Sequence, residues 1–169
     1  MPAGAGDPCT PLAAHATLAS PQDGDVYLRA GSAACDRIAV EVVGRGLDGA
    51  FTLAFDLHFP PDLLVYDGYA GGAFLEQGSP HMPPLYLVRV TAPGSVAVTM
   101  TRFAPDPAVG ATGDAVIVTL RFRKAAVGIG TIDFDRAPAS GTLEQVLGAD
   151  GAARTARFGP GHGAALTVP

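Results

Sequence analysis

The stretch Phe51-Thr52-Leu53-Ala54-Phe55-Asp56-Leu57-His58-Phe59-Pro60-Pro61 decides the fold. Large apolar residues occupy every odd position from 51 to 59, and smaller or polar residues lie between them. A period of two is typical of a β-strand with one apolar face. Pro60-Pro61 ends the strand, because proline cannot donate a hydrogen bond to a neighbouring strand. We expect residues 63–66 to form a short apolar plug, followed by glycine turns at residues 67–68 and 71–72.

Shorter alternating segments, separated mainly by Gly, Pro and Asp, run along the rest of the chain. No long window has the 3.6-residue period of a helix, and one or two helical turns are expected only near residues 74–77 and 143–147. The pattern predicts an all-β fold, an antiparallel two-sheet sandwich of about nine strands with jelly-roll or immunoglobulin-like character. The expected strands are residues 26–28, 38–43, 51–59, 85–91, 96–102, 115–123, 129–134, 154–158 and 164–168, with one extra strand within 12–19. The core between the two sheets should contain Phe55, Leu57, Val98, Leu120 and Phe122.

Bulk properties narrow the class of protein further. A chain of 169 residues predicts one domain, which we place at residues 25–169 behind an N-terminal arm of residues 1–24. The net charge of -5 argues against nucleic acid or an anionic membrane surface as partner. No run of about 18 apolar residues predicts a membrane span, and residues 1–4 lack the start of a signal peptide.

Cys9 and Cys35 are the two cysteines of the chain. Either they are unpaired small apolar residues, or they form a disulfide that tethers the arm, as an exported protein would favour. We predict the disulfide, which would enclose 25 residues (35 − 9 − 1). A zinc site needs more ligands at close spacing, and no histidine is near either cysteine in the sequence.

The sequence offers no positive sign of catalysis. It has no nucleophile elbow and no phosphate-binding loop. Asp133 and Asp135 form a carboxylate pair on one face of a strand, which we expect to face solvent, although calcium ligation remains an alternative. We therefore predict a protein that is not an enzyme and has no cofactor or metal. The four histidines are too far apart in sequence to form a ligand pair: His15, His58, His81 and His162.

Direct sugar binding is a serious alternative. Carbohydrate-binding modules often stack sugars on exposed aromatic rings, but this chain has no tryptophan. Several of its tyrosines fall in apolar runs that should be buried, which weakens this alternative: Tyr27, Tyr66, Tyr69 and Tyr86.

The order of these segments resembles that of cohesin modules of the cellulosome scaffold type. The resemblance rests on residues 26–28 and 38–42, the strand and proline stop at 55–64, and residues 94–98, 113–122 and 126–134. It departs from the family where this chain has Phe59-Pro60-Pro61 in place of Tyr-Asp-Pro, and in its cysteine pair and N-terminal arm.

The resemblance implies a secreted or cell-surface module that binds a dockerin-like protein in a polysaccharide-handling assembly. Polysaccharide itself is a further expected partner, and we expect a monomer. Two alternatives stay open: a carbohydrate-binding module and a structural or adhesive domain of a surface protein. In the family the partner docks across one sheet, here matched to residues 51–59, 85–91, 96–102 and 115–123. The outward positions that we assign to this sheet are Thr52, Ala54, Asp56, His58, Ala97, Thr99, Thr101, Thr119 and Arg121.

Overall fold

The computed structural model describes residues 9–135, 144–159 and 161–169. In this part of the chain there are strands and turns but no helix. The strands are β1 (Ala13–Ala16), β2 (Val26–Ala33), β3 (Arg37–Arg45), β4 (Thr52–His58), β5 (Leu64–Gly71), β6 (Leu85–Ala92), β7 (Ser95–Thr101), β8 (Asp114–Lys124), β9 (Gly128–Phe134), β10 (Gln145–Leu147) and β11 (Ala164–Val168).

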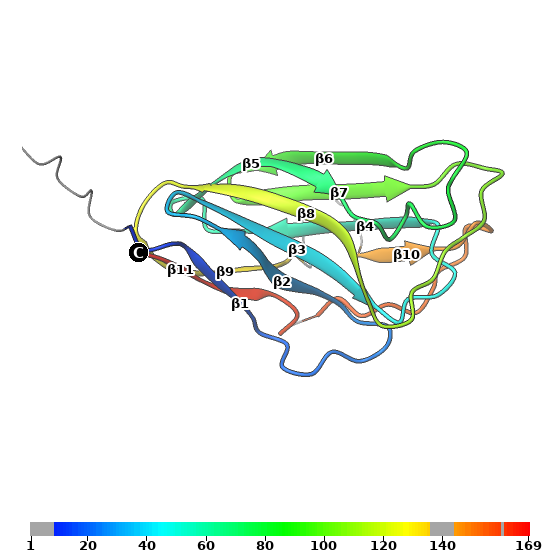
Figure 1. The fold of residues 1–169 in the computed structure, drawn as a ribbon, viewed down its shortest axis with the longest axis horizontal. Coiled ribbons are helices and arrows are strands. Elements are labelled where there is room, and N and C mark those ends of the chain that lie inside the picture. The colour runs from blue at the N-terminus through cyan, green and yellow to red at the C-terminus, as the bar shows by residue number, and fades with distance from the viewer. Residues whose placement is uncertain (1–8, 136–143, 160) are drawn as a thin grey trace, which may run out of the picture.

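The strands form two packed sheets. One has seven strands, in the order β1-β11-β9-β4-β7-β6, with β10 also paired to β4. The other has four strands, in the order β2-β3-β8-β5. Neighbouring strands pair antiparallel in both sheets. Figure 1 shows the two layers, with β8, β3 and β2 in the layer nearer the viewer. The predicted all-β antiparallel sandwich is confirmed.

The predicted core is also confirmed. Phe55, Leu57, Val98 and Leu120 have no exposed surface, and Phe122 is 1% exposed. Aromatic rings fill the space between the sheets, where the Phe55 ring meets that of Phe134 edge-on with their centroids 5.6 Å apart. Edge-on contact suits aromatic rings, because the positive edge of one ring meets the negative face of the other.

Three local predictions were wrong. Residues 64–71 form strand β5, where we expected a plug and turns, because a register shift near Gly68 (φ 114°) lets the strand continue along β8. Residues 145–147 form strand β10 on β4, where we expected a helical turn, and Leu143 lies outside the described residues. Residues 154–158 do not form a strand: Ala153 and Arg157 make isolated bridges.

The start and the end of the described chain are joined at one side of the sandwich. Cys9 and Cys35 form the predicted disulfide, with their Cα atoms 5.6 Å apart. Just after Cys9, strand β1 pairs with the C-terminal strand β11. The extra strand expected within residues 12–19 is therefore confirmed as β1, and the segment that we predicted as an arm contributes it to the seven-stranded sheet (Figure 1).

Candidate partner-binding face

The outer face of β4, β7 and β6 is built from three strands in register. Side chains of alternate residues point to the same face of a strand, and cross-strand partners share that face. The strands therefore bring three rows of side chains together on the side away from the core. The rows are Thr52, Thr101 and Leu85; Ala54, Thr99 and Leu87; and Asp56, Ala97 and Arg89.

Exposure falls steeply across this face, from β6 to β4. Leu87 is 57% exposed and Thr99 is half-buried, but Ala54 is only 4% exposed. Ala97 is 7% exposed, and Asp56 on β4 is fully buried. The face is thus open along β6, half-covered at Thr99 and Thr101 of β7, and covered at Ala97 and along the middle of β4.

This gradient corrects part of the predicted site. Ala54, Asp56 and Ala97 are buried, so a partner cannot reach them as the structure stands. Alternation along a strand determines where a side chain points, but not whether another segment of the protein covers it. Of the other predicted positions in this sheet, His58 is exposed, and Thr52, Thr99 and Thr101 are half-buried. The hydroxyl oxygens of Thr52 and Thr101 form a cross-strand hydrogen bond of 2.7 Å.

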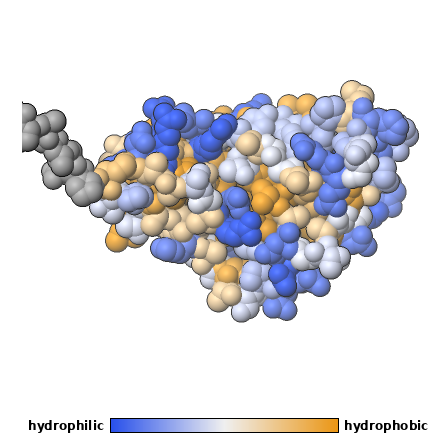
Figure 2. Space-filling model, viewed as in Figure 1, coloured by the Kyte–Doolittle hydropathy of each residue, from blue (hydrophilic) through white to orange (hydrophobic). Residues whose placement is uncertain are grey.

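Thr119 and Arg121 lie on the other side of the molecule. Both are in β8, which pairs with β3 and β5 in the four-stranded sheet. The prediction that they share a face with Thr99 was therefore wrong. In the seven-stranded sheet the place beside β4 is taken by β9, where Asp133 pairs with His58. Figure 2 shows the molecule from the side of the four-stranded sheet, with strongly hydrophilic side chains scattered among small and apolar ones.

Strand β6 supplies outward residues that the sequence reasoning did not assign. Tyr86 and Val88 pack against the core, whereas Leu85 (41% exposed), Leu87 and Arg89 point outward. The run Leu85-Tyr86-Leu87-Val88 is apolar throughout, so the usual contrast between the two faces is missing from the sequence. One signal in the sequence did point to β6 as an edge strand: the run lies between the proline-rich loop of residues 79–84 and the turn at residues 93–94.

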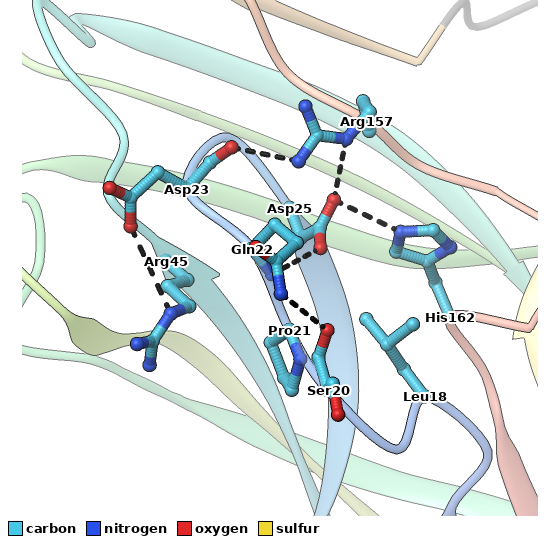
Figure 3. Close-up of a pocket in the computed structure, with 9 residues that line it drawn as sticks. All are labelled: Leu18, Ser20, Pro21, Gln22, Asp23, Asp25, Arg45, Arg157 and His162. Carbon is cyan, nitrogen blue, oxygen red and sulfur yellow. Dashed lines mark hydrogen bonds and ion pairs between the residues drawn. The ribbon is translucent and has the colours of Figure 1, made fainter.

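A separate hollow lies at the turn before β2, and the buried carboxylate of Asp25 is among the groups that line it (Figure 3). Asp25 is 3% exposed and accepts hydrogen bonds from Arg157 Nε at 2.7 Å and from the Gln22 backbone N–H at 2.7 Å. His162 Nε2 lies 3.3 Å from the same carboxylate. Burial by itself would raise the pKa of Asp25, but these hydrogen bonds lower it below the ordinary value.

This cluster joins two distant parts of the chain. Arg157 also donates to the Asp23 carbonyl oxygen, and its backbone carbonyl accepts from Val26 N–H. The turn before β2 is thereby held to the segment that precedes β11. The hydrogen bonds of Asp25 and Arg157 therefore act as a structural tie between these two parts of the chain.

The remaining candidates for chemistry are dispersed. Within the described ranges, no three His, Cys, Asp or Glu side chains gather closely enough to hold a metal ion. His81 bonds through Nδ1 to the buried carboxylate of Asp106 at 2.6 Å, and His15 is exposed on β1. Asp133 accepts a hydrogen bond from the N–H of Phe134. The described residues contain no helix long and apolar enough to cross a membrane.

The tyrosines do not form an open stacking platform. Tyr27 is 3% exposed and donates to Asp114 Oδ2 at 2.8 Å, and burial together with this carboxylate raises its pKa to about 12. Tyr66, Tyr69 and Tyr86 are partly buried and pack against the core. Tyr69 and Tyr86 face each other across the sandwich edge, with ring centroids 6.1 Å apart.

A comparison with solved structures shows which known proteins share this architecture. A non-cellulosomal cohesin from Archaeoglobus fulgidus matches 78% of the chain over 84% of its own length, with a TM-score of 0.54 and 16% identity. The chain has the cohesin fold. A type II cohesin domain from the cellulosome of Acetivibrio cellulolyticus covers 86% of the chain over 94% of its own length, with a TM-score of 0.58 and 10% identity.

A third cohesin neighbour carries a partner. The sixth cohesin of scaffoldin B from Acetivibrio cellulolyticus, in complex with a dockerin, matches 80% of this chain over 92% of its own length, with a TM-score of 0.57 and 15% identity. No family model matches the sequence, and the search of curated proteins found no match. At these identities, the cohesin likeness describes the fold of the chain.

Proposed function

We propose that this chain is a non-catalytic binding module that recognises a dockerin-like protein partner. The contact surface in this proposal is the exposed part of the outer face of β4, β7 and β6. The observation that supports it most is the pair of exposed leucines, Leu85 and Leu87, beside Thr99 on the outer face of the seven-stranded sheet. Exposed aliphatic side chains on an open sheet face are suited to docking, because burying them releases water from apolar surface. Cohesin neighbours of this fold have been solved in complex with dockerins.

We further propose that the module is exported, as a secreted or cell-surface protein, and works as a monomer in a polysaccharide-handling assembly. The disulfide between Cys9 and Cys35 supports the export, because disulfides persist in oxidising compartments. Binding of a protein, rather than of sugar, is supported by the absence of tryptophan and by the partly buried tyrosines.

A matched pair of substitutions tests the proposed face. Thr99→Arg places a long charged side chain in the centre of the open part of the seven-stranded sheet. Thr119→Arg makes the same change on the outer face of the four-stranded sheet. Both positions are half-buried strand threonines, so both variants should keep a melting temperature within a few degrees of the parent.

The binding assay uses purified dockerin modules from the genome that encodes this chain, measured by calorimetry with and without calcium. We expect Thr99→Arg to abolish binding to the cognate module and Thr119→Arg to leave it unchanged. A partner that binds the Thr99→Arg variant as tightly as the parent would exclude this face. A glycan array that shows tight, specific sugar binding by the parent, with no dockerin bound, would favour the carbohydrate-binding alternative.

A further inference from the structure

We infer that Arg89 selects the partner: the contacting element is an amphipathic α-helix that lies along β6 and presents two apolar side chains and then an acidic one. This inference rests on the proposed function and specifies its partner. It is carried by three side chains in a line, Leu85, Leu87 and Arg89, all exposed and all on the outer face of β6.

The spacing of this line matches a helix. Alternate residues of a strand are about 6.8 Å apart along one face. Residues four apart in an α-helix are separated by about 6 Å along its axis. A helix parallel to β6 can therefore place a side chain beside Leu85, a second beside Leu87 one turn later, and a third beside Arg89 after another turn.

Arg89 is the charged end of this line. It makes no hydrogen bond or ion pair with any other residue in the described part of the chain, whereas exposed arginines elsewhere, such as Arg123 with Asp67, are paired. The leucines beside it reduce the local access of water once a partner docks, which strengthens attraction to an opposite charge. The complementary group on the partner is therefore a carboxylate next to an apolar stripe.

The surroundings determine the direction of the helix. Toward β4 the face is closed at Ala97 and Asp56, which are buried, so a partner lies along β6 instead of crossing the sheet. Toward the free edge, Tyr69 reaches the backbone of β6, with its hydroxyl 3.5 Å from the Tyr86 carbonyl oxygen. This contact takes up part of the edge that an added β-strand would need, whereas the side-chain face stays open.

Two display libraries test the inference without a known partner. One displays a helical scaffold with a single randomised face, and the other displays linear peptides. Each is selected separately against the parent and Arg89→Glu, and only clones that lose binding to Thr99→Arg are counted. Arg37→Glu serves as the matched control, since Arg37 is a 65% exposed arginine on β3 in the other sheet.

We expect the parent to enrich helical clones with two apolar residues one turn apart followed by Asp or Glu. Selection against Arg89→Glu should enrich Lys or Arg at that same position. Clones selected on the parent should lose about tenfold in affinity on Arg89→Glu and less than about twofold on Arg37→Glu.

Other outcomes have distinct meanings. Clones that depend on Thr99 but carry no acid, or that bind Arg89→Glu unchanged, would overturn the inference and leave the proposed face intact. The same holds if only linear peptides are enriched, since β6 would then bind a strand. Self-association of the parent that Arg89→Glu abolishes would assign β6 to a second copy and overturn the inference too. If no clone from either library depends on Thr99, the outer face of β4, β7 and β6 is not the contact surface, and the proposed function itself is contradicted.

Discussion

Replacing Phe55 with alanine is the sharpest test of how the sandwich core is assembled. Phe55 is fully buried on β4, the strand whose sequence decides the fold. Its ring packs against Phe134 at 5.6 Å and against Phe158 at 5.9 Å between centroids. These contacts join β4, β9 and the segment before β11, so the ring holds together parts of the chain that are far apart in sequence.

The expected loss of unfolding free energy for Phe55→Ala follows from the complete burial of the ring. Removing a fully buried phenylalanine ring loses its transfer free energy and leaves a cavity, which together cost about 3–5 kcal/mol. For a protein of this size, that lowers the melting temperature by about 6–20 °C. Phe55→Leu keeps most of the volume and should cost about 1–1.5 kcal/mol. Leu87→Ala changes a side chain that is 57% exposed and should cost under about 0.5 kcal/mol.

The assay is urea unfolding of the oxidised protein, followed by near-ultraviolet and far-ultraviolet circular dichroism to check that one transition is observed. We expect the three variants to rank Phe55→Ala, Phe55→Leu, Leu87→Ala in decreasing loss of stability. A loss below about 1 kcal/mol for Phe55→Ala, with an unchanged denaturant slope, would refute the placement of odd-numbered β4 residues in the core.

Two further predictions concern the ties outside the core. Cys35→Ser should lower the free energy of unfolding by about 3 kcal/mol, because the disulfide with Cys9 closes a loop in the unfolded chain. Mass spectrometry of the unreduced parent should find no free thiol. Two alkylatable thiols in the parent would contradict the disulfide. Because its folded pKa is lowered, Asp25 adds stability above the ordinary carboxyl pKa of 3.8 that is lost as the pH falls through the folded value. Asp25→Asn should therefore lower the free energy of unfolding at pH 7, and lower it less in acid. An equal loss of unfolding free energy at pH 7 and pH 2.5 would exclude the ionised contact of Asp25 with Arg157 and His162.

The facing of the strands could be predicted from sequence because alternation is a local property. Along β4 the odd positions are large and apolar, and Leu53, Phe55 and Leu57 are indeed fully buried. The same reasoning placed Val98 and Leu120 correctly on β7 and β8. Where alternation is absent, as in the apolar run that begins β6, the facing could not be assigned, although Leu87 turned out to be one of the most exposed aliphatic residues.

Pairing between strands could not be predicted in the same way, because it depends on contacts between residues distant in sequence. Strand β8 alternates just as β7 does, and nothing in its own sequence states which sheet it joins. The structure pairs it with β3 over most of its length, and so moves Thr119 and Arg121 to the opposite side of the molecule from Thr99. A strand pattern thus identifies half-buried faces without showing which of them meet.

Burial of outward-pointing residues is a second limit on prediction, and it bears directly on the proposed binding face. Asp56 and Ala54 point away from the core on β4, yet they are 0% and 4% exposed. A site deduced from alternation alone would centre on β4, whereas the accessible surface centres on β6, with Thr99 and Thr101 of β7 half-buried beside it. Since affinity depends on a few side chains that a partner can desolvate, this shift moves the expected energetic centre of the proposed face from the small and polar residues of β4 to Leu87 and Arg89 on β6. The character of the expected partner changes with it, from one that complements small and polar side chains to one that carries apolar and acidic groups.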